Sequence, residues 1–82
     1  MLTIKVLGSG CANCKRLEAE TRAALDAAGI AYDLTKVTEY PDIMAYGVMS
    51  TPALVINEQV VSTGRVLARS KIVELAQGFE PT

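Results

Sequence analysis

The fold of this chain is decided by the stretch LTIKVLGSGCANC, residues 2–14. Its first six residues alternate, with Leu2, Ile4 and Val6 on one face, and this period of two predicts a β-strand. The glycine-rich tripeptide at 8–10 interrupts the strand. Residues 12–28 are rich in Ala, Leu, Arg and Glu, which predicts a helix. The two cysteines of the chain therefore lie where a first strand passes into a first helix.

The rest of the chain continues as alternating helices and strands. The first helix carries small or apolar residues at helical spacing, and Gly29 is placed to end it. A continuous apolar run at 53–56 indicates a buried strand. The further elements that we expect are a strand at 30–37, a short helix capped by Thr38 or Tyr40 and running through Tyr46, a turn at 57–58, a strand at 60–61, a helix at 70–77 and a tail at 79–82.

This order of elements, β-α-β-α-β-β-α, predicts the topology. A strand-helix-strand opening gives a parallel pair of strands with a right-handed crossover. The last two strands form an antiparallel hairpin. We therefore expect an α/β fold with a four-stranded mixed sheet flanked by helices. With 82 residues in all, residues 1–82 suit a single domain.

Composition and charge exclude several classes of function. The formal net charge is −1, and no basic stripe marks a nucleic-acid-binding surface. No apolar run approaches the roughly 18 residues needed to span a bilayer. The N-terminal residues alternate like a strand and do not resemble a signal peptide, so we expect no membrane association and a cytoplasmic protein.

The pair Cys11 and Cys14 carries the chemistry. A bridge between them closes too short a loop to serve as a structural staple, which favours redox or metal chemistry. The start of a helix presents unpaired N–H groups, so we expect a lowered pKa for Cys11. Cys14 extends the apolar stripe of the helix and should be buried, whereas Cys11 should be exposed. These positions predict Cys11 as the catalytic nucleophile, Cys14 as the resolving thiol, and a reversible Cys11–Cys14 disulfide.

Metal binding is the alternative function for the same two thiolates. Two soft sulfur ligands suit Cu(I), so a copper-binding module remains the rival interpretation. Zinc takes four ligands, and a chain with two cysteines and no histidine lacks the usual set. The redox interpretation requires no metal ion and no other cofactor.

Two stretches, GSGCANCK at 8–15 and YGVMSTPALVIN at 46–57, resemble the small thioredoxin-like redox-active disulfide protein family, which is similar to glutaredoxins in size. The resemblance covers essentially the whole chain and implies a thioredoxin-like fold with protein disulfide oxidoreductase activity. In that fold a cis-proline faces the cysteine pair, and the residue before it offers backbone groups to the substrate. The resemblance thus implies that Pro52 is this proline and that Thr51 binds substrate.

The same resemblance bears on the partners. It implies a disulfide-containing protein or small molecule as substrate and an upstream reductase. Ala12 and Asn13 match neither the Gly-Pro of thioredoxins nor the Pro-Tyr of glutaredoxins. Only Gly64, followed by Arg65, lies where glutaredoxins carry a Gly-Gly and an acidic residue for glutathione, so glutathione is not the expected ligand. Small copper-carrying domains run β-α-β-β-α-β and lack the Thr-Pro pair, which disfavours the copper alternative.

Overall fold

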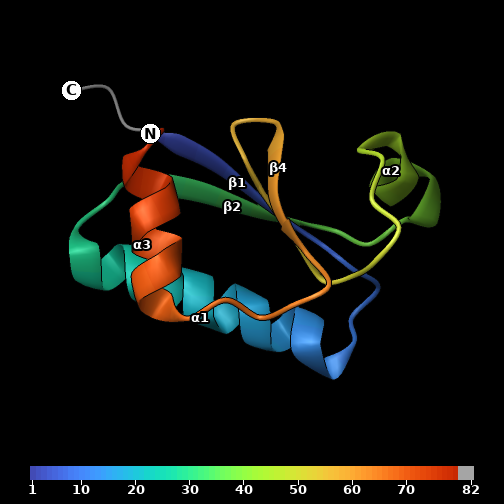
Figure 1. The fold of residues 1–82 in the computed structure, drawn as a ribbon, viewed down its shortest axis with the longest axis horizontal. Helices are drawn as coiled ribbons and strands as arrows, with labels where there is room; N and C mark the ends of the chain where they lie inside the picture. Colours follow the sequence, from blue (N-terminus) through green and yellow to red (C-terminus); the bar gives the residue numbers. More distant parts are fainter. Residues whose placement is uncertain (80–82) are drawn as a thin grey trace.

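The fold follows the predicted order of strands and helices. It was obtained as a computed structural model, and the structure describes residues 1–79 (Figure 1). Among these residues, none of the helices is long and apolar enough to cross a membrane. The elements are β1 (Leu2–Leu7), α1 (Ala12–Ala28), β2 (Tyr32–Val37), α2 (Tyr40–Ala45), β3 (Ala53–Ile56), β4 (Gln59–Thr63) and α3 (Arg69–Gln77).

The four strands form one mixed sheet in the order β2-β1-β3-β4. β1 and β2 are parallel, with Leu2 beside Tyr32 and Leu7 beside Val37. β3 is antiparallel to both β1 and β4. The expected four-stranded mixed sheet with a parallel opening and an antiparallel closing hairpin is therefore confirmed.

The core consists of two apolar clusters, one on each face of the sheet. The even-numbered residues of β1 face α1 and α3, which lie together in Figure 1, whereas Leu7 faces the side on which α2 packs. β3 is buried along its whole length because it has a strand on each side and apolar cover on both faces. The larger cluster contains Leu2, Ile4, Val6, Leu17, Ala24, Leu25, Ile30, Leu54, Ile56, Ile72 and Ala76, and the smaller one Leu7, Ile43, Val48, Ala53 and Val55.

The exit from α1 explains why the second strand begins later than predicted. Gly29 has φ +70° and ends the helix, as expected from the sequence. Ile30 is buried, and its N–H donates to the Leu25 carbonyl oxygen at 3.0 Å. Ile30 therefore closes the helix end, and β2 starts at Tyr32. The sequence prediction was wrong here because a helix-closing apolar residue fits the alternation of the strand that follows.

Smaller differences concern the other boundaries. The residue that precedes α2 is Glu39, whose side chain makes no capping bond, so neither Thr38 nor Tyr40 is the cap. The helix ends at Ala45, one residue before the predicted end. β4 is longer than the predicted 60–61, and α3 begins at Arg69. Phe79 packs against the larger cluster and does not start a tail, whereas residues 80–82 of the predicted tail lie outside the described residues.

Candidate active site

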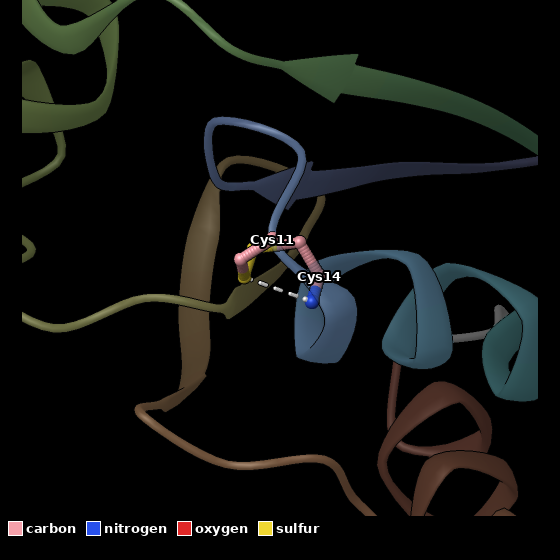
Figure 2. Close-up of a disulfide and its surroundings, with 2 residues drawn as sticks. All are labelled: Cys11 and Cys14. Atoms are coloured by element: carbon pink, nitrogen blue, oxygen red, sulfur yellow. Dashed lines mark hydrogen bonds between the residues drawn. A yellow bond between two sulfur atoms is a disulfide. The ribbon is translucent and has the colours of Figure 1, made fainter.

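Cys11 is the capping residue at the start of α1. Its backbone is extended (φ −66°, ψ 164°), and its Sγ accepts a hydrogen bond from the N–H of Cys14 at 3.1 Å (Figure 2). Its carbonyl oxygen accepts the first helical hydrogen bond, from the Lys15 N–H at 3.0 Å. A serine or threonine oxygen usually occupies such a position. The sulfur of Cys11 thus lies directly against the positive end of the helix.

The structure holds the two cysteines as the disulfide that the sequence predicts. Their Cα atoms are 5.0 Å apart, within the range that a disulfide requires. Cys11 is exposed to solvent, whereas Cys14 is only 5% exposed. Cys14 lies one turn before Leu17 on the buried stripe of α1, which explains the difference. One sulfur is therefore open to a partner, and the other lies behind it.

Gly8 lets the helix approach the end of β1 closely enough to place Cys14. A Cβ atom at position 8 would overlap the Cys14 Sγ and would lie 3.8 Å from the Cβ of Thr51. Gly8, Cys14 and Thr51 therefore meet at one point. From the sequence, Gly8 is expected only to interrupt the strand. A glycine at the end of a strand, next to a Cys-x-x-Cys motif, is the sequence signal that could have indicated the close approach.

The Thr51–Pro52 segment forms the wall beside the disulfide. The peptide bond between the two residues is cis. Pro52 is buried, Thr51 is exposed, and the Pro52 carbonyl oxygen accepts a hydrogen bond from the Gly64 N–H at 2.8 Å. Because Pro52 directly precedes β3, its missing N–H removes no bond from the strand ladder. The structure thus brings all four predicted site residues to one end of the sheet.

A small cavity of about 50 Å³ lies behind Cys14. Its walls come from the end of β1, the loop that follows it, the first turn of α1 and the end of β2. The residues that line it with Cys14 are Val6, Gly8, Gly10, Lys15, Lys36 and Thr38. Sequence reasoning missed Lys36 and Thr38, because they lie more than 20 positions after Cys14 and only the parallel pairing of β1 with β2 brings them near.

A second polar group lies around Lys5, in the middle of β1, on the face of the sheet that α2 covers. The Lys5 Nζ lies 2.6 Å from Glu58 Oε1 and donates to the Tyr46 hydroxyl at 2.8 Å, and that hydroxyl donates to Glu58 Oε2 at 3.0 Å. The hydrogen bonds that Lys5 donates to Glu58 and Tyr46 raise the pKa of Lys5. The hydrogen bond from Lys5 lowers the pKa of Glu58. Each charge of this group is balanced within it.

The copper interpretation gains no support from the fold or from the site. The observed element order is β-α-β-α-β-β-α and differs from the β-α-β-β-α-β order of small copper-carrying domains. Within residues 1–79, no group of three or more His, Cys, Asp or Glu side chains is arranged to hold a metal ion.

Comparisons with known proteins agree with this geometry. The family described as Thioredoxin domain matches residues 2–77. The thioredoxin of Methanothermobacter thermautotrophicus is 32% identical over 75 residues, which cover 92% of this chain and 97% of that protein. The thioredoxin of Methanocaldococcus jannaschii is 27% identical over 79 residues, 96% of this chain and 91% of that protein.

A solved structure is similar in fold. It is thioredoxin-2 of the malaria parasite, described as a component of that organism's protein secretion machinery, and it matches with a TM-score of 0.70. At 14% identity over 95% of this chain and 82% of that one, it shows the fold alone. The family match and the two relatives extend over nearly the whole chain, and the family match spans Cys11 and Cys14. The chain therefore belongs to the thioredoxin family and is a thiol–disulfide oxidoreductase.

Proposed function

We propose that Cys11 is the attacking thiol of this oxidoreductase and that Cys14 is the resolving thiol. The observation that carries the assignment is the difference in exposure, because a partner disulfide can reach Cys11 but not Cys14. The Cys11 thiolate attacks one sulfur of the partner disulfide and expels the other as a thiolate. Cys14 then attacks the Cys11 Sγ, forms the intramolecular disulfide and releases the reduced partner. Two electrons pass from the dithiol to the partner.

The start of α1 supports the role of Cys11. In this structure the Cys14 N–H donates to the Cys11 Sγ at 3.1 Å. The same N–H stabilises a thiolate more than a thiol, and the positive end of the helix adds to this preference. The thiolate is the form that attacks a disulfide. We therefore expect the pKa of the Cys11 thiol in the reduced protein to be lower than that of an ordinary cysteine.

We infer that Thr51 and Pro52 form the surface on which the partner lies. Thr51 is exposed and lies near the Cys14 sulfur. A Cβ atom added at Gly8 would overlap that sulfur and would also lie 3.8 Å from the Thr51 Cβ. Pro52 is buried and held by its hydrogen bond to Gly64. Met49, two residues before Thr51, is 98% exposed and extends this surface with an apolar side chain. Such a surface suits an extended segment that carries the partner's disulfide.

The partners and the compartment follow as parts of the same proposal. A thioredoxin that has reduced its partner is left as a disulfide, so its turnover requires an upstream reductase. The substrate is a disulfide-containing protein or small molecule. Both cysteines belong to the redox pair, and no structural disulfide accompanies it among the described residues, which fits the reducing cytoplasm.

We also propose that residues 1–82 form a single domain.

Two serine variants test the assignment of the thiols. Cys14→Ser should still attack a protein disulfide and should accumulate a mixed disulfide that can be isolated and mapped to Cys11. Cys11→Ser should form no mixed disulfide at a measurable rate. Ser9→Ala, an exposed change in the same loop, serves as the control and should keep wild-type turnover. A mixed disulfide trapped on Cys14, or faster alkylation of Cys14 than of Cys11 in the reduced protein, would reverse the assignment.

A further inference from the structure

The resolving step places an unusual demand on Cys14. This sulfur must act as a thiolate, yet the residue is only 5% exposed. Burial disfavours the charged form and raises the pKa of a thiol. Without a compensating group, Cys14 would be protonated near neutral pH and the mixed disulfide would resolve slowly. The surroundings of Cys14 must therefore supply the compensation.

The charged residues that line the cavity behind Cys14 are lysines. Lys15 of α1 and Lys36 of β2 line the cavity of about 50 Å³ behind it. Two threonines also lie near Cys14, namely Thr38, which lines the same cavity, and Thr51, in the loop before β3. Within the described chain, no aspartate or glutamate lines the cavity, and the sequence contains no histidine. A proton acceptor of the carboxylate or imidazole type is therefore missing from this cavity.

The counter-charges of these two lysines are weak. Lys15 takes part in no ion pair within residues 1–79. Lys36 pairs only with Glu18, at 3.7 Å, the longest of the ion pairs in the described chain. Glu18 also binds Arg22 at 3.2 Å, so its charge is shared. Among the described residues, the charge of Lys15 is thus unpaired, and that of Lys36 is paired only at a long distance with a carboxylate that it shares with Arg22.

We propose that Lys15 and Lys36 stabilise the Cys14 thiolate and thereby set the rate of the resolving step. This inference rests on the proposed role of Cys14. A cavity of this volume can admit a water molecule, through which the thiol proton leaves for solvent. The electron pair on Cys14 then forms the bond to the Cys11 Sγ. The bond between Cys11 and the partner breaks, and its electron pair leaves on the partner sulfur, which takes up a proton from solvent.

The first test measures the ionisation of Cys14 directly. In a Cys11→Ser background, the rate of alkylation by iodoacetamide is followed against pH, because only the thiolate reacts. Lys15→Gln and Lys36→Gln together should lower the thiolate fraction at neutral pH about tenfold, which corresponds to a rise of about one unit in the pKa of Cys14. Lys36→Arg should restore much of the loss. The control is Lys71→Gln, a lysine of α3 that pairs with Glu74, and it should have no effect.

The second test separates this inference from the proposed function. Dithiodipyridine, a neutral disulfide, releases one coloured thione when Cys11 attacks and a second when Cys14 resolves the mixed disulfide. The lysine substitutions should slow the second release about tenfold at neutral pH and leave the first within a factor of about two, since a tenfold change is one pKa unit. An unchanged second phase would overturn the role of the lysines. A first phase that survives in Cys11→Ser would overturn the proposed function.

Discussion

The two ends of β1 are built in opposite ways. Near its beginning, the turn between β3 and β4 supplies polar partners: the Thr3 N–H donates to the Asn57 Oδ1 at 3.0 Å, and Lys5, in the middle of the strand, pairs with Glu58 of the same turn. Beyond its last residue lie Cys11 and Thr51, which are exposed, together with lysines whose ion pairs are weak or absent among the described residues. The beginning of β1 thus lies beside the turn of the β3–β4 hairpin, whereas the disulfide lies beyond its last residue.

This difference indicates how a chain of 82 residues combines stability with reactivity. At the hairpin end, the polar side chains of Lys5, Tyr46 and Glu58 bind one another. The disulfide end leaves a sulfur, a hydroxyl and positive charges available for contacts that form only during the reaction. The two ends share the core between the sheet and α1, because α1 starts at the disulfide and returns beside the start of β1. We therefore expect substitutions at one end to affect reactivity and at the other end stability alone.

The largest expected effect comes from a matched pair of leucines on α1. Leu17 and Leu25 are both fully buried in the same cluster, but Leu17 lies one turn after Cys14 and Leu25 at the far end of the helix. Leu17→Ala and Leu25→Ala should each lower the free energy of unfolding by about 3–4 kcal/mol, measured by denaturant titration. Only Leu17→Ala should also speed the alkylation of Cys14 in the reduced protein. If Cys14 were alkylated at the same rate in both variants, the packing at the start of α1 would not protect Cys14 more than the packing at its end does.

The next effect comes from a pair of glycines in the loop before Cys11. A Cβ at Gly8 would overlap the Cys14 sulfur, so Gly8→Ala should cost about 2 kcal/mol by overpacking and slow disulfide exchange several-fold. Gly10 has φ +88° and no atom within 4 Å of an added Cβ. Gly10→Ala should therefore cost about 1 kcal/mol of backbone strain and leave the rate of the resolving step unchanged. The measurements are the free energy of unfolding and the rate of disulfide exchange for both variants. A slower resolving step in Gly10→Ala would contradict the steric explanation.

The sequence predicted most of the fold because its strongest patterns are local. The alternation in β1, the apolar run of β3 and the stripe of α1 each specify an element without reference to the rest of the chain. The exposure of Cys11 and the burial of Cys14 follow from that stripe and are confirmed.

What the sequence did not predict depends on contacts between distant segments. Lys36 lines the cavity behind Cys14 only because β2 lies parallel to β1, and nothing in its own neighbourhood indicates this. The role of Gly8 depends on where α1 brings the Cys14 sulfur. Thr51 was placed by resemblance and not by any pattern in the residues. Ile30 was misassigned because one apolar residue satisfies both the end of a helix and the start of a strand.

A smaller effect is expected at the hairpin end, from Asn57. This residue has φ +50°, and its side chain accepts a hydrogen bond from the Thr3 N–H. Asn57→Ala should lower the free energy of unfolding by about 1–2 kcal/mol through the lost hydrogen bond and the left-handed backbone, with no change in disulfide exchange. Asn57→Gly removes the same hydrogen bond but tolerates the backbone, so it should cost less. An altered exchange rate in either variant would contradict the separation of the two ends.

The smallest expected effect is that of Glu58→Gln, and its dependence on pH is the informative part. Lys5 lowers the pKa of Glu58 in the folded protein, so this carboxylate stabilises the fold above its unfolded pKa of about 4.3 and ceases to do so as the pH falls through the folded value. Glu58 raises the pKa of Lys5, so the ammonium contributes below about pH 10.4, and this contribution is lost only at higher pH.

Wild type and Glu58→Gln should therefore differ slightly in denaturant midpoint between those limits and converge in acid. Because Glu58 is largely exposed, added salt should shrink the difference. Tyr46→Phe provides the control, since it removes the hydroxyl shared by both groups but leaves their charges in place. A difference that persists in acid would mean that the side chain of Glu58 stabilises the hairpin through its hydrogen bonds and not through its charge.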